Sequence, residues 1–153
     1  MKTQIEVKEI TDLHFAAVTC EGTQELGSAF GKIIQWATSK GVMVSDAKLL
    51  TVFHDSFKDK PSNKVRMSVG IVVVDIDGGD SSVNWQTIQG GKYIVGHSEI
   101  GMDEFQETWT GLFAWMNEQG LKKGSADPFE IYHNDYNEHP EKKCIVDMYI
   151  PLM

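Results

Sequence analysis

Long hydrophobic runs are missing from this sequence of 153 residues, and the longest apolar stretch, around residues 70–74, is only strand-sized. A membrane-spanning helix needs ~20 consecutive apolar residues, so none is predicted. Basic residues are also scarce: 14 Lys and Arg face 22 Asp and Glu, which gives a net charge of −8. Nucleic-acid affinity depends on clustered Lys and Arg, so direct contact with nucleic acid is excluded. An acidic surface instead concentrates cationic small molecules.

Cysteine is rare, because only Cys20 and Cys144 are present and no Cys-x-x-Cys spacing occurs. The first nine residues alternate charged and apolar side chains, unlike a signal peptide, so we expect a cytoplasmic protein with reduced, buried thiols. The histidines lack the spacing of a zinc site. Phosphate-cradling loops and Gly-x-Ser-x-Gly elbows are missing too, so neither a metal nor a cofactor is predicted.

An internal repeat organises the chain at an offset of 79 residues. Its identical pairs are Gly22/Gly101, Glu25/Glu104, Trp36/Trp115, Gly41/Gly120, Ala47/Ala126, His54/His133, Pro61/Pro140 and Lys64/Lys143. Aromatic character is kept at Phe30/Trp109, Phe53/Tyr132 and Phe57/Tyr136. Two copies of this length predict a single domain built from pseudo-repeats at about residues 1–76 and 83–153, with residues 75–82 as the linker.

Each repeat predicts the order strand, helix, strand, strand. Residues 15–20 and 93–98 are rich in β-formers. Apolar side chains then recur at helical spacing over residues 26–37 and 105–116, and each helix is expected to stop at a glycine, Gly41 or Gly120. The remaining strands are predicted at 49–55, 65–74, 128–134 and 144–150. The fold class is therefore α+β, with two helices on one face of a mainly antiparallel sheet and a ligand cleft at the pseudo-two-fold axis.

Strand alternation sorts the side chains of the strand predicted at 128–134 in the second repeat. Phe129, Ile131 and His133 share one face, which we expect to lie under the helix. Glu130 and Tyr132 share the other face, which we expect to line the cleft. The repeat offset places Phe53 on the cleft face with Tyr132, whereas the counterpart of Glu130 is the neutral residue Thr51.

A carboxylate at position 130, flanked by Phe129, Ile131 and Tyr132, loses solvation unless a cation or a donor compensates. This pattern predicts either a cationic ligand or an acid/base role for Glu130. The alternative is that Glu130 lies at a solvent-exposed strand edge or pairs with a lysine. Trp85, near the crossover between repeats, and Tyr149, on the last strand, are further candidates for lining the cavity. We expect the Trp36/Trp115 pair to fill the core and the His54/His133 pair to be hydrogen-bonded.

Together these features resemble the GyrI-like small-molecule-binding proteins, also called AraC-type effector-binding domains. The resemblance covers nearly the whole chain and rests on the doubled module and on several short stretches. They are Gly-Gly-Lys-Tyr at 90–93, Trp109 with Trp115, Pro-Phe-Glu-Ile-Tyr at 128–132, and Val-Asp-Met-Tyr-Ile-Pro at 146–151. In this family a glutamate of the Phe-Glu-Ile-Tyr motif lies in the ligand cleft, so the resemblance implies that Glu130 and Tyr132 are site residues.

The resemblance and the composition leave three functions open. The first is a stand-alone protein that binds a hydrophobic or cationic small molecule through Glu130, Tyr132, Phe53, Trp85 and Tyr149, aromatic faces attracting the cation. The second is a cofactor-free hydrolase of cyclopropane-containing electrophiles, in which Glu130 and Tyr132 are catalytic. The third is a protein that modulates gyrase or confers toxin resistance. No helix-turn-helix domain is expected, so control of transcription by this chain alone is disfavoured.

Overall fold

The computed structural model describes residues 3–43, 47–73 and 83–153. These residues fall into two compact units. The N-terminal unit consists of the described residues within Asp12–Gln89, and the C-terminal unit combines the described residues up to Thr11 with Gly90–Met153. No helix in these described ranges is long and apolar enough to cross a membrane. Because the predicted linker at residues 75–82 lies outside the described residues, the structure leaves it untested.

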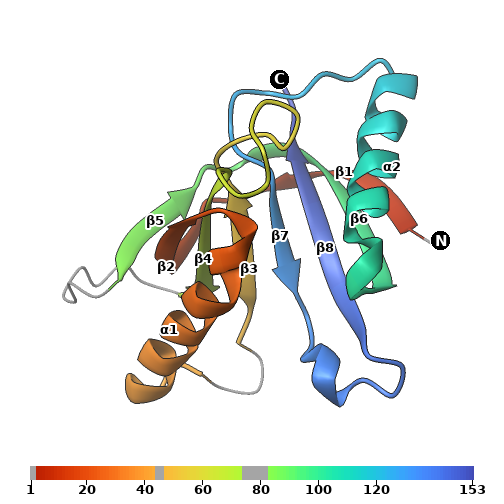
Figure 1. The fold of residues 1–153 in the computed structure, drawn as a ribbon. Coiled ribbons are helices and arrows are strands. Elements are labelled where there is room, and N and C mark those ends of the chain that lie inside the picture. Colours follow the sequence, from red (N-terminus) through yellow and green to blue (C-terminus); the bar gives the residue numbers. More distant parts are fainter. Residues whose placement is uncertain (1–2, 44–46, 74–82) are drawn as a thin grey trace. The chain divides into compact units, whose positions relative to one another are not determined.

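The N-terminal unit contains one helix and four antiparallel strands (Figure 1). Its elements are β2 (Leu13–Glu21), a short 3-10 turn η1 (Thr23–Glu25), α1 (Leu26–Ser39), β3 (Leu49–Phe53), β4 (Arg66–Val72) and β5 (Asn84–Ile88). The strands are ordered β3-β4-β2-β5. Helix α1 packs on this sheet through Ala29, Ile33 and Ala37, which meet Ala16, Val69 and Ile71 in a fully buried cluster.

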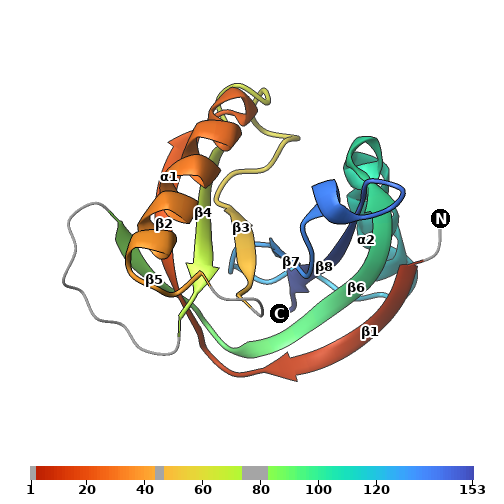
Figure 2. The same ribbon diagram turned by 90° about the horizontal axis from the view of Figure 1, so that it is seen from below.

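The C-terminal unit repeats the arrangement. Its elements are β1 (Thr3–Ile10), β6 (Gly91–Gly101), the turn η2 (Met102–Glu104), α2 (Phe105–Glu118), β7 (Phe129–Tyr132), the turn η3 (Tyr136–Glu138) and β8 (Lys143–Pro151). The antiparallel order is β1-β6-β8-β7, and Figure 2 shows β1 running alongside β6. Leu112 and Met116 of α2 pack on Val146, Met148 and Ile150 of β8. The α+β fold class and the order strand, helix, strand, strand are confirmed in both units.

The two helices end where the repeated glycines predict. Gly41 has φ 72° and Gly120 has φ 71°, the left-handed conformation in which a glycine carries no Cβ penalty. Behind each glycine the chain closes back on the helix, because Val42 N donates to Ala37 O and Leu121 N donates to Met116 O. The same hydrogen bond at the same repeat position shows that the duplication preserved the helix stop.

Two edge strands were not predicted. β1 is half-exposed and mixes charged with apolar residues, so its composition alone is not typical of a buried strand. It forms because all eight of its residues pair with β6. β5 pairs with β2 in the same way at the other unit's edge. The predicted strand 49–55 ends at Phe53, because the Asp55 carboxylate turns to accept hydrogen bonds from Lys60 and Arg66.

Candidate functional site

The strand face that carries Glu130 lies under helix α2. Trp109 of α2 donates its indole N–H to Glu130, and the register pairs Glu130 with Met148, a member of the cluster beneath the helix. Phe129 pairs instead with Tyr149, on the opposite face. The expectation that Phe129, Ile131 and His133 lie on the helix side was therefore wrong. Alternation along a strand fixes which side chains share a face, but the helix decides which face is covered.

The same correction applies to Tyr132 and to the corresponding strand of the first repeat. Tyr132 also packs in the cluster under α2. In the N-terminal unit, Thr51 and Phe53 pair with Val69 and Met67, and Val69 lies in the cluster beneath α1. Leu50 and Val52 consequently occupy the face away from α1. The predicted grouping of residues on each strand holds in both units, while the assignment of the two faces is reversed.

Glu130 is the central group of the candidate site and is only 5% exposed. Its Oε1 accepts a hydrogen bond of 2.7 Å from the Tyr132 hydroxyl, and its Oε2 accepts one of 3.2 Å from Trp109 Nε1. Both donors are neutral. No ion pair to Glu130 occurs within the described part of the chain, so the lysine partner considered from the sequence is not the explanation for its burial.

Burial dominates the electrostatics of Glu130. It raises the pKa of the carboxyl from 4.5 to about 7, against the opposing effect of the hydrogen bonds from Tyr132 and Trp109. Two neutral donors compensate only part of the free energy lost when a carboxylate leaves water. Both protonation states of the group are therefore populated near pH 7, and a cation placed beside it would favour the ionised form.

The two repeats differ at the three positions that form this site. Trp109, Glu130 and Tyr132 correspond, at the offset of 79, to Phe30, Thr51 and Phe53. Thr51 is as deeply buried as Glu130, with 1% exposure. The second repeat thus carries a buried acid together with both of its hydrogen-bond donors, where the first carries a threonine and two phenylalanines. Because both repeats have the same order of strand, helix, strand and strand, this difference is chemical rather than architectural.

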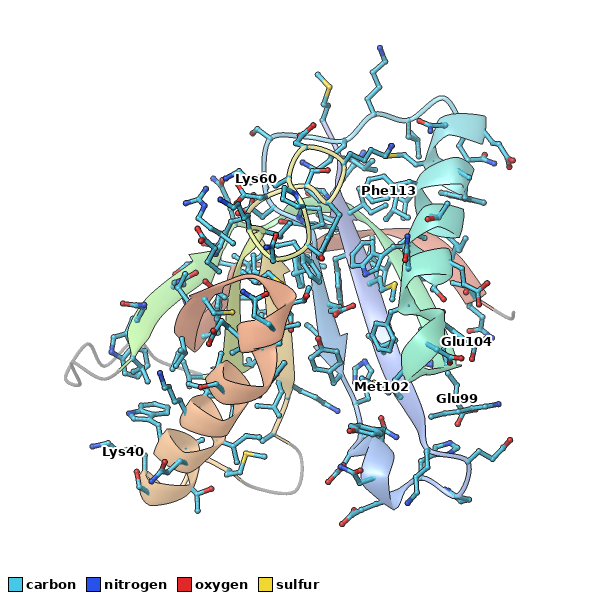
Figure 3. All side chains as sticks on the ribbon, viewed as in Figure 1. Lys40, Lys60, Glu99, Met102, Glu104 and Phe113 are labelled. Carbon is cyan, nitrogen blue, oxygen red and sulfur yellow. The ribbon has the colours of Figure 1, made fainter. Side chains whose placement is uncertain are left out.

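Trp109 is the site residue that the sequence reasoning did not assign. It was recognised as part of the repeat and of the family resemblance, but alternation along β7 says nothing about donors on a helix. The combined replacement of Phe30 and Thr51 by Trp109 and Glu130 was the available signal. Phe113, one turn further along α2, lies 6.1 Å from the Trp109 ring between centroids and is labelled in Figure 3.

Tyr149 lies on the sheet face opposite Glu130. Its ring stacks on Phe129 with centroids 4.3 Å apart and an interplanar angle of 8°, and Tyr93 meets both rings edge-on. The prediction that Tyr149 lines the same cavity as Glu130 is therefore wrong. Alternate residues of β8 face opposite ways, and Met148 already occupies the face of Glu130.

Phe53 and Trp85 belong to the N-terminal unit. Phe53 contacts Phe57 edge-on, with ring centroids 5.9 Å apart. Trp85 lies 5.7 Å from Trp36 of α1 and packs against the cluster under that helix. A role for either residue in one site with Glu130 stays a prediction. The predicted hydrogen bonds of the paired histidines are present, since His54 contacts Ser68 at 2.7 Å and His133 contacts Asp147 at 2.9 Å.

The sequence model described as the GyrI-like small molecule binding domain matches residues 3–153. The chain belongs to this family. The GyrI-like chain is 22% identical over 139 residues to a DNA gyrase inhibitor from Edwardsiella piscicida, covering 86% of this chain and 88% of the relative. Membership of this family indicates small-molecule binding in general terms. Neither the fold nor Glu130 alone indicates that function.

Solved structures share the fold of the GyrI-like chain. The EcmrR C-terminal domain superposes with a TM-score of 0.78 at 16% identity, over 100% of this chain and 99% of that one. SAV2435 bound to tetraphenylphosphonium gives a TM-score of 0.63 at 15% identity, over 98% and 94% of the two chains. At these identities the likeness establishes the GyrI-like architecture alone.

Proposed function

We propose that this chain binds a hydrophobic cation, with Glu130 as the charge partner. The observation that carries the proposal is a carboxyl group 5% exposed, whose partners are the neutral donors Trp109 and Tyr132. A buried carboxylate without a cation is unfavourable, and a bound organic cation offsets part of that penalty. The attraction between the ligand's charge and Glu130 is then stronger than that between two charges at the surface, because the site has a lower dielectric constant than water.

The side chains around Glu130 supply the apolar contact area. Trp109 and Tyr132 are partly exposed, whereas the carboxyl group that they contact is buried. The two rings therefore lie between Glu130 and the solvent. Aromatic faces attract cations by about 0.5–2 kcal/mol each. The longer hydrogen bond, 3.2 Å from Trp109, is the one we expect the ligand to displace, while Tyr132 keeps the carboxylate oriented.

The similarity to SAV2435, whose structure contains tetraphenylphosphonium, supports a ligand of this class. The net charge of −8 supports the same sign, because it favours the approach of cations over anions. An action on gyrase is suggested by a relative that is 22% identical, and no described residue of this chain supports it.

Tetraphenylphosphonium and tetraphenylborate test the proposal, because the two ions have the same shape and opposite charge. Calorimetric titration of the unmodified chain at pH 8 should give an affinity for the cation at least about tenfold higher than for the anion, equivalent to ~1.4 kcal/mol. Equal affinities would mean that the site recognises the apolar surface of the ions and not their charge. Equal affinities or preferential binding of the anion would contradict the role of Glu130.

A hydrolase remains the second candidate because of one observation. The pKa of about 7 at Glu130 suits a general base at neutral pH, and the Tyr132 hydroxyl at 2.7 Å is placed to exchange a proton with it. The hydrolase hypothesis predicts that the unmodified chain turns over a strained electrophile and that Glu130→Gln does not. Stoichiometric binding without product favours the binding function.

A further inference from the structure

Three metal-ligating side chains meet on the sheet face of the C-terminal unit that points away from α2. His97 lies on β6 directly opposite Asp147 on β8, and His133 follows the end of β7. His97 Nδ1 is 2.5 Å from Asp147 Oδ1, and His133 Nε2 is 2.9 Å from Asp147 Oδ2. One carboxylate therefore holds two imidazoles, each through a nitrogen that can also bind a metal.

We propose that His97, His133 and Asp147 form a binding site for a divalent transition-metal ion such as Zn²⁺. One ligand atom from each residue lies within 4.8 Å of the others. Two imidazole nitrogens and one carboxylate oxygen suit borderline ions such as Zn²⁺, Co²⁺ and Ni²⁺ rather than Ca²⁺ or Mg²⁺. Zn–N and Zn–O bonds of about 2.0–2.2 Å place tetrahedral ligands ~3.3 Å apart, so small side-chain rotations bring the three atoms into position.

The site is open on one side. The side chain of His97 is 50% exposed, that of His133 28% and that of Asp147 17%. Three protein ligands and an exposed edge leave room for water or a small ligand in the remaining coordination positions, as in catalytic rather than structural zinc sites. The nearby Glu99 is held by His139 at 2.6 Å and is not needed as a ligand.

The first repeat provides an internal comparison. His54 is the counterpart of His133, but it meets Ser68 where His133 meets Asp147. Across the strands, Ser68 pairs with Thr19 as Asp147 pairs with His97, so strand pairing makes Thr19 the counterpart of His97, although Thr19 aligns with Ser98 at the offset of 79. The histidine that follows β3 or β7 is thus common to both repeats. The carboxylate and the second imidazole that a metal requires occur only in the second, on a face separate from Glu130.

Zinc titration of the untagged chain in a non-chelating buffer tests this site. Calorimetry should detect one ion per chain. Asp147→Ser and His97→Thr install the residues of the first repeat and should each weaken binding at least about tenfold. Circular dichroism of each variant verifies folding, and two independent variants keep the test decisive if one fails to fold.

The matched control is His54→Gln, which removes the histidine of the repeat that lacks the other two ligands and should leave zinc affinity unchanged. Co²⁺ provides a spectroscopic readout, because intense visible bands accompany a coordination number below six. Absence of one-to-one binding, or binding unaffected by both Asp147→Ser and His97→Thr, would overturn the proposal. The three residues would then form only a hydrogen-bonded network.

Discussion

Glu130→Gln is expected to bind tetraphenylphosphonium at least about tenfold more weakly than the unmodified chain at pH 8. The amide keeps the size of the side chain and its hydrogen bond from Tyr132, but it carries no charge to pair with the ligand. The cationic ligand loses water when it binds, and the Glu130 carboxylate compensates for that loss. A neutral amide at this position does not. Calorimetry measures the difference.

The matched control is Glu107→Gln, which removes one exposed carboxylate from the same helix that carries Trp109. Its affinity should remain within about twofold, because exposed charges are screened by solvent and salt. The effect of Glu130→Gln should also shrink toward pH 5, where the carboxyl of the unmodified chain is protonated in the absence of ligand. Similar losses in both variants, or a loss that is independent of pH, would contradict a local charge pair.

The second large effect concerns stability against pH. Because burial raises the pKa of Glu130 to about 7, the folded chain keeps a proton that the unfolded chain releases near pH 4.5. Stability is therefore highest below the unfolded pKa and is lost as the pH rises through the folded pKa. One pKa unit corresponds to ~1.4 kcal/mol, so this group should lower the free energy of unfolding by about 2–3 kcal/mol between pH 5 and pH 8.

Urea denaturation of the unmodified chain and of Glu130→Gln at both pH values measures this difference. The variant lacks the titrating group, so its stability should fall by about 2–3 kcal/mol less over the same range. The subtraction removes the contributions that the two proteins share. Asp55, whose pKa the hydrogen bonds from Arg66 and Lys60 hold far below its usual range, titrates only in stronger acid. Parallel pH profiles for the two proteins would show that Glu130 is not desolvated.

The repeat in the sequence predicted much of the fold because glycines and apolar spacing act locally. Gly41 and Gly120 stop the helices through their own backbone conformation, and the apolar stripe of α2 is set by its period. β1 could not be recognised in that way, since its half-exposed residues become a strand only by pairing with β6, almost ninety residues later.

The site could be predicted only in part. Glu130 was recognised because it interrupts the repeat, and Tyr132 because it is an aromatic residue on the same strand face. Both fit a family motif, and a hydrogen bond joins them. Trp109 was missed because its contact crosses from helix to strand, which no strand pattern encodes. The cluster of His97, His133 and Asp147 was missed because pairing between strands brings its members together, and the spacing of the residues along the chain does not show it.

The ionisation of Glu130 itself tests the account most directly. Carbon-13 NMR of the labelled glutamate side chains, followed against pH with and without saturating tetraphenylphosphonium, reports the pKa of this carboxyl in both states. The account predicts a pKa of about 7 in the free chain, falling by at least one unit when the cation binds. A value near 4.5 in the free chain, or one that the bound cation leaves unchanged, would contradict it.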